Sequence, residues 1–187
     1  MVKQSFLFGL LLLIVLALPP VADLMESIML VHMHMQMPLL VVAGFLMGGY
    51  FQKRFECFFN KWNENGVPGI LLFSIVLLYW TLPRTMDEAL TLMSVEIFKF
   101  FSLTFLAGVP LRNSWRKLKT SWKNTVIISF TVIFVGWGWI YIQSPTALCN
   151  NYLLSDQIIL GWGFLVTAFC MVLFLAYTLF IDPSEYE

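Results

Sequence analysis

Charged side chains are scarce in this sequence, because Asp, Glu, Lys and Arg make up only 12% of its 187 residues whereas 59% are hydrophobic. Soluble domains average about 25% charged residues, so the composition excludes an ordinary soluble globular protein. There is also no excess of charge of either sign, since 11 basic residues balance 11 acidic ones. Nucleic-acid binding requires a basic surface. We therefore expect no nucleic-acid partner and predict an integral membrane protein.

Cysteine pairs and catalytic signatures are also missing. The three cysteines, Cys57, Cys149 and Cys170, show no CxxC spacing, so neither a disulfide framework nor a zinc site is indicated. The chain contains no GxSxG, no HExxH and no glycine-rich phosphate-binding loop, which are signatures of common enzyme classes. We expect that the polypeptide alone is not an enzyme, and a reaction at a bound metal stays open.

Long apolar segments dominate what is present. About 20 apolar residues in a helix cross the hydrocarbon layer of a bilayer, and six segments approach that length. The first also resembles a secretory signal, but Pro19 and Pro20 and the poor cleavage site near Ala22 favour its retention as a span. The sequence therefore predicts an all-α, polytopic bundle of about six transmembrane helices in one integral membrane domain, residues 1–187. The predicted spans are 6–22, 28–50, 68–82, 89–110, 124–142 and 157–181.

Basic residues give the predicted orientation. If six spans alternate across the membrane, nine basic residues share the side of the two termini, and only Arg84 lies in a loop on the other side. Basic loops stay in the cytoplasm, so we predict cytoplasmic termini in a bacterial or archaeal plasma membrane. The nine residues are Lys3, Lys53, Arg54, Lys61, Arg112, Arg116, Lys117, Lys119 and Lys123.

Two further features concern helix packing and buried charge. Gly44 and Gly48 form a GxxxG motif on the second span, which is typical of a close helix crossing. Glu96 and Lys99 lie three residues apart within the fourth span. Intramembrane charges are costly and are usually paired, and positions i and i+3 of a helix are neighbours. We therefore predict an intramembrane ion pair between Glu96 and Lys99.

The most unusual segment is 25–38, which contains both histidines and five of the ten methionines. Asp23 and Glu26 have the spacing of an N-terminal capping pair, so we expect the second helix to begin there, on the outer side of the membrane. Helical spacing then puts Met25, Met29, His32 and Gln36 on one face. His34 points elsewhere on an ideal helix, and local unwinding at Pro38 would be needed to bring the two imidazoles together.

Thioether sulfur and imidazole together favour Cu(I). The candidate copper ligands are His32 and His34, with Met29, Met33, Met35 and Met37 as softer auxiliary ligands or a transfer path. Two alternatives remain open. The histidines could ligate haem iron, or the methionines could be flexible apolar filling and the histidines interfacial hydrogen-bonding groups.

The stretch from His32 to Leu40, HMHMQMPLL, resembles the His/Met-rich helix of CtaG-like cytochrome oxidase assembly proteins, in which a proline and leucines follow the histidines. The resemblance covers about residues 25–49. It implies a polytopic membrane protein associated with copper delivery to an oxidase, and it carries over His32 and His34 as candidate ligands. Ctr-type copper transporters also combine methionine motifs with GxxxG, but their three-span plan does not fit six predicted spans.

The sequence therefore predicts a copper-binding membrane protein that assists assembly or metallation of a membrane metalloenzyme such as a terminal oxidase. Its expected partners are the lipid bilayer, that metalloenzyme and other membrane subunits. The alternatives are a non-catalytic accessory or scaffold subunit of a membrane complex, a small transporter, and a haem-binding subunit.

Overall fold

The computed structural model describes residues 2–180, and every regular element in that range is a helix. The predicted all-α class is confirmed. Within the predicted single domain, the described residues form two compact units. Unit 1 contains residues 2–118 and 148–152, and unit 2 contains residues 119–147 and 153–180.

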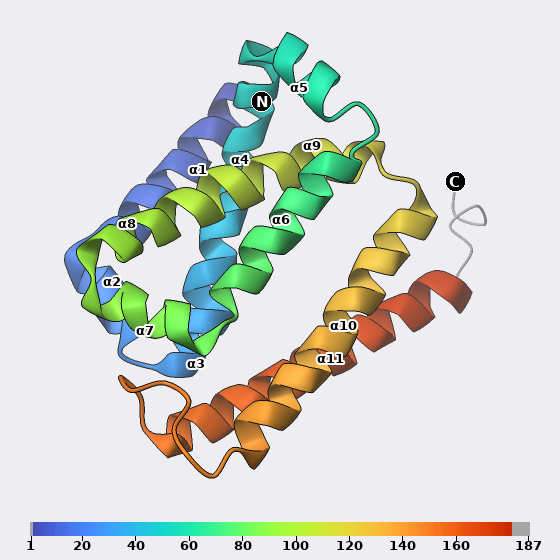
Figure 1. The fold of residues 1–187 in the computed structure, drawn as a ribbon. Coiled ribbons are helices and arrows are strands. Elements are labelled where there is room, and N and C mark those ends of the chain that lie inside the picture. The colour runs from blue at the N-terminus through green and yellow to red at the C-terminus, as the bar shows by residue number, and fades with distance from the viewer. Residues whose placement is uncertain (1, 181–187) are drawn as a thin grey trace. The chain divides into compact units, whose positions relative to one another are not determined.

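Four long helical segments form unit 1 (Figure 1). Two of them are single helices, and two are continuous rods that each contain a π-helical segment. The central rod contacts both α1 and the second rod, which in turn packs on α6. The elements are α1 (Val2–Ala17), the central rod α3 (Met29–Val31), η1 (His32–Gln36) and α4 (Met37–Arg54), then α6 (Val67–Trp80), and the second rod α8 (Met93–Phe101), η2 (Ser102–Gly108) and α9 (Val109–Lys117).

Three short helices lie at the two ends of this unit. Figure 1 shows α5 (Glu56–Trp62) at the end where α1 begins, and α2 (Pro19–Glu26) and α7 (Pro83–Thr91) at the opposite end. The chain bends by 70° between α1 and α2 and by 73° between α6 and α7. Each bend precedes a proline that starts the next helix, since proline favours a first helical turn but cannot continue the helix before it.

The first bend corrects two expectations. The predicted span 6–22 is not one straight helix, because Leu18 is extended and Pro19 starts α2. Asp23 and Glu26 do not begin the second long helix either. They lie in the last turns of α2, and the central rod begins at Met29 after the extended residue Ile28.

Four continuous helices are long and apolar enough to cross a membrane, and the number rises to six if each bent pair is one span. The continuous ones are Met29–Arg54, Met93–Lys117, Thr120–Gln143 and Leu154–Thr178. The fourth predicted span begins at Met93 rather than residue 89, because Leu92 is extended. It also continues past Pro110 to Lys117. Residue 181, the predicted end of the sixth span, lies outside the described residues.

Unit 2 is a helical hairpin of α10 (Thr120–Gln143) and α11 (Leu154–Phe180), which pack along each other. Their close approach lies at Gly138, where an added Cβ atom would be 3.0 Å from the carbonyl oxygen of Gly161. Only 17% and 22% of their most apolar windows are buried, against 50% for the central rod. Most of the apolar surface of this hairpin is therefore left for lipid.

The two π-helical segments have a common local cause. Pro38 and Pro110 cannot donate a backbone hydrogen bond to the preceding turn, and each lies just after a widened segment. In η1 the N–H of Met37 bonds to the carbonyl of His32, five residues back, and in η2 the N–H of Val109 bonds to Thr104 in the same way. Such π-helical turns are frequent at functional sites.

Gly44 lies where the two rods of unit 1 cross. A Cβ atom there would overlap the carbonyl oxygen of Thr104, and one at Gly108 would overlap that of Val41. Gly48 is one turn further on, where an added Cβ atom would be 3.2 Å from the side chain of Arg112. The backbones therefore approach each other at a distance that only glycine permits at Gly44 and Gly108.

We predict that Gly44→Ala lowers the free energy of unfolding in detergent by about 1–3 kcal/mol, the usual cost of overpacking, because the obstructing atom belongs to the backbone. Gly136→Ala is the matched control, since nothing lies within 4 Å of a Cβ atom there. Denaturant titration followed by circular dichroism measures both variants. Equal stability of the two variants would contradict the crossing geometry.

Candidate functional site

A buried ion pair lies at the end of unit 1 that carries α2. Lys99 on α8 has no exposed surface, and its Nζ lies 2.5 Å from Oε1 of Glu26 at the end of α2. Gln36 of η1 donates from Nε2 to the same carboxylate oxygen over 2.9 Å, and its own Oε1 lies 3.5 Å from the Lys99 ammonium. Three separate helical segments thus meet around one neutralised charge, an arrangement that intramembrane ionisable residues require.

This pair corrects the sequence-based prediction. The buried Lys99 is neutralised by Glu26, 73 residues away, rather than by Glu96 on the same helix. Glu96 is half-buried, which gives its carboxylate access to solvent or headgroups. The bend before α2 is the reason, because it aims the end of that helix at α8.

The backbone of Lys99 is tied to α6 as well. The indole Nε1 of Trp80 donates to the hydroxyl of Ser102 over 2.9 Å, and that hydroxyl lies 3.4 Å from the carbonyl oxygen of Lys99. Trp80 and Ser102 are both buried. Because Ser102 is the first residue of η2, the polar contacts begin where the second rod widens.

His32 stands beside this cluster, with no exposed surface. Its Nδ1 lies 3.4 Å from the hydroxyl of Tyr152, and that hydroxyl is 2.6 Å from the carbonyl oxygen of Glu26. A tyrosine hydroxyl has one proton, which it donates to the carbonyl. Nδ1 of a neutral His32 ring is then the donor to the hydroxyl oxygen. This tautomer leaves a lone pair on Nε2, which is buried and has no hydrogen-bond partner.

Tyr152 is the last residue of the segment 148–152, which belongs to unit 1 although it connects the two helices of the hairpin. Contacts of this segment with unit 1 hold the tyrosine in place. The carboxylate of Asp87 on α7 accepts from the backbone N–H of Asn150 at 2.8 Å and from the Asn151 side chain at 3.2 Å. Cys149 is fully buried, and its Sγ lies 3.8 Å from the carbonyl oxygen of Pro83. Asp87, Asn150 and Asn151 therefore fix the position of the tyrosine.

The methionines of the segment divide into two groups. Met29, Met33 and Met37 are buried at 0%, 7% and 4% exposure, whereas Met35 is 52% exposed. His34 is partly buried. The predicted shared face is confirmed for Met29, His32 and Gln36, which all have no exposed surface. Met25 was predicted on the same face but lies on α2, because the extended residue Ile28 separates that helix from the central rod. Widening of the helix at η1 leaves His32 in the interior and Met35 on the surface.

No three imidazole, thiol or carboxylate side chains among residues 2–180 gather as a metal site would require. Imidazole and thioether side chains are both present on the buried side of the His/Met segment. His32 supplies one imidazole lone pair, and Met29 lies one helical turn before it. Such a donor set suits a soft ion such as Cu(I).

Comparison with known proteins found no matching family model, no similar curated protein and no similar solved structure. The site therefore has to be interpreted from its own geometry.

The sequence did not reveal the contacts that Glu26, Gln36 and Tyr152 make in this cluster. Glu26 was assigned to a helix start, although it is the one carboxylate within the segment 25–38. Gln36 was placed on the correct face without its partner Lys99. Tyr152 is 120 residues from His32, and nothing in the sequence connects them.

We predict that Glu26→Gln destabilises the protein by about 3–5 kcal/mol, because the buried Lys99 ammonium loses its counter-charge. Glu96→Gln removes an equal charge from the same unit and should cost less than about 1 kcal/mol, as for a partly exposed charge. The double variant Glu26→Gln/Lys99→Met should recover part of the loss. Unfolding in detergent measures all three, and a larger effect of Glu96→Gln would overturn the assigned pair.

Proposed function

We propose that this protein binds Cu(I) at His32 and assists assembly or metallation of a membrane metalloenzyme such as a terminal oxidase. The observation that carries the proposal is the Nε2 atom of His32, a buried lone pair without a hydrogen-bond partner, beside buried methionines of the same helix. An imidazole held in that tautomer by a second hydrogen bond is the usual form of a metal-ligating histidine.

The surroundings of His32 suit a soft monovalent ion. The sulfur atoms of Met29 and Met33 are the nearest thioethers along the chain on the buried side, and thioethers favour Cu(I) over harder ions. The positive charge of Lys99 is compensated by Glu26, so a cation at His32 would not face an unpaired ammonium. Copper is here a cargo, and the exposed Met35 with the partly buried His34 forms its exchange path to a partner.

The assembly role is favoured over catalysis because the ionisable groups beside His32 are already engaged. The Glu26 carboxylate is used by Lys99 and Gln36, and the Tyr152 hydroxyl by a carbonyl. General acid–base catalysis needs a group free to exchange a proton with a substrate. The resemblance of residues 25–49 to copper-delivering assembly proteins supports the same role.

The copper proposal predicts about one Cu(I) per chain after anaerobic loading with ascorbate in detergent. His32→Leu should weaken binding more than tenfold in competition with a chromophoric Cu(I) chelator, since one strong ligand is lost, and Met29→Leu should weaken it less. Met93→Leu is the matched control, because that thioether is exposed and belongs to neither the proposed ligands nor the exchange path, and it should leave the affinity unchanged.

Equal copper content in the wild type and His32→Leu would contradict the proposal, and a Soret band in the purified protein would favour haem instead. The assembly role has its own measurement, which is the copper content of the membrane metalloenzymes in a strain that lacks this protein. That content should fall, and it should be restored by the wild-type gene but not by His32→Leu.

We also propose that both termini are cytoplasmic and that the segment 25–38 faces the outer side of a plasma membrane. The excess of basic residues at the end of unit 1 where α1 begins supports this orientation. Alkaline phosphatase inserted between residues 144 and 153 should be active, since it folds only outside the cytoplasm, whereas the same enzyme fused at residue 66 should be inactive. The reverse pattern would show the opposite orientation.

A further inference from the structure

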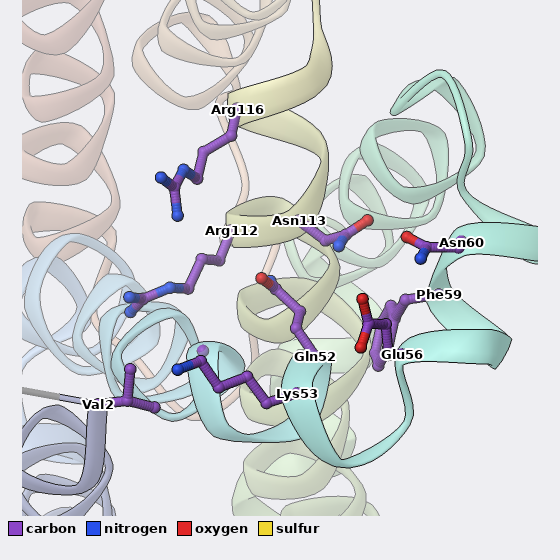
Figure 2. Close-up of a pocket in the computed structure, with 10 residues that line it drawn as sticks. Val2, Gln52, Lys53, Glu56, Phe59, Asn60, Arg112, Asn113 and Arg116 are labelled. Atoms are coloured by element: carbon purple, nitrogen blue, oxygen red, sulfur yellow. The ribbon is translucent and has the colours of Figure 1, made fainter.

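A cavity lies at the other end of unit 1, where α1 begins and α4 ends. It has a volume of about 530 Å³, and three cationic side chains line it, Lys53 of α4 with Arg112 and Arg116 of α9. Figure 2 shows these three side chains extending in the same direction from their two helices. One carboxylate, Glu56, also lines the cavity, so the cationic groups outnumber it.

Arg112 is a fixed element of this cavity. Its Nη1 donates to the carbonyl of Phe45 over 2.9 Å and lies 3.3 Å from that of Leu46, and its guanidinium is 5.4 Å from the centre of the Phe45 ring. Gly49 also lies against it, since a Cβ atom there would be 3.0 Å from Nη2. A guanidinium held in this way is preorganised and loses little conformational entropy when it binds an anion.

Neutral donors complete the lining. Gln52, Asn60 and Asn113 contribute amide groups. The Nε2 atom of Gln52 is buried and makes no hydrogen bond in the structure, although a buried amide donor is normally satisfied. Cationic groups and an unused amide donor together suit a phosphate group, whose oxygens accept several hydrogen bonds.

An apolar cavity of about 380 Å³ adjoins the basic one, and Phe59 lines both. Its other walls come from α4, α5, η2 and α9, and every residue in them is apolar. A free phosphate would make no favourable contact with such a surface, whereas a lipid presents a phosphate next to hydrocarbon. The lining residues are Phe51, Phe55, Phe58, Phe59, Phe105 and Val109.

We propose that this pair of cavities binds one anionic phospholipid, with its headgroup phosphate against Lys53, Arg112 and Arg116 and an acyl chain against the phenylalanines. The excess of cationic groups selects a lipid of net negative charge over a zwitterionic one, because the ammonium of a zwitterion would add a fourth cation. The lipid site is independent of the proposed copper site, since the two share no residue.

The experiment uses the full chain in detergent, with phosphatidylglycerol and phosphatidylcholine added separately and binding followed by native mass spectrometry. Lys53→Gln/Arg116→Gln removes two lining charges. Arg54→Gln/Lys61→Gln is the matched control, because it removes two exposed charges of the same unit that do not line the cavity. At about 1 kcal/mol per basic residue near anionic lipid, the first variant should bind phosphatidylglycerol about 30-fold more weakly, and the control should bind as the wild type does.

Three results would overturn the proposal. Equal loss in the control would mean diffuse surface charge, and equal binding of phosphatidylcholine would mean ordinary annular lipid. Displacement of phosphatidylglycerol by millimolar inorganic phosphate would mean that the free anion is the ligand. Phe58→Ala, which alters only the apolar cavity, should weaken the binding of long-chain phosphatidylglycerol but not of its short-chain analogue, and an unchanged affinity for the long-chain lipid would also count against the acyl-chain contact.

Discussion

A lysine ammonium buried in an apolar bundle has to be neutralised, and the end of unit 1 that carries α2 is arranged around that requirement. Lys99 has no exposed surface and obtains its counter-charge from Glu26. An isolated charge within a membrane costs several kcal/mol. The 70° bend before α2 avoids this cost, because it brings Glu26 to Lys99. The bend directs the end of α2 at α8, and Gln36 closes the group from the central rod.

His32 depends on the same contacts. Tyr152 donates its only proton to the carbonyl of Glu26, which sets the tautomer of the imidazole and leaves Nε2 as a buried lone pair. One π-helical segment begins at His32 itself and the other begins three residues after Lys99, and each precedes a proline. A widened helical turn, a buried charge and a buried imidazole nitrogen without a hydrogen-bond partner therefore lie together, a combination that is frequent at functional sites.

The two ends of unit 1 provide opposite chemistry. The end that carries α2 offers soft, neutral donors around a compensated charge, whereas the end where α1 begins offers uncompensated cations beside phenylalanines. The same central rod provides the close crossing at Gly44 and the contacts of Gly48 and Gly49 with Arg112. The proposed cation site and the proposed anionic-lipid site are therefore compatible with a chain of zero net charge.

The sequence by itself determined the helical class, most span positions and the buried face of Met29, His32 and Gln36, because hydropathy and the helical repeat are local properties. It also marked Gly44 and the His/Met segment. Only the tertiary structure decided the partner of Lys99, the tautomer of His32 and the cavity at Arg112. The reason is physical: helix spacing offers Glu96 to Lys99, but burial of an ammonium is decided by which carboxylate the folded chain brings into the same interior, and here the bend at Pro19 brings Glu26.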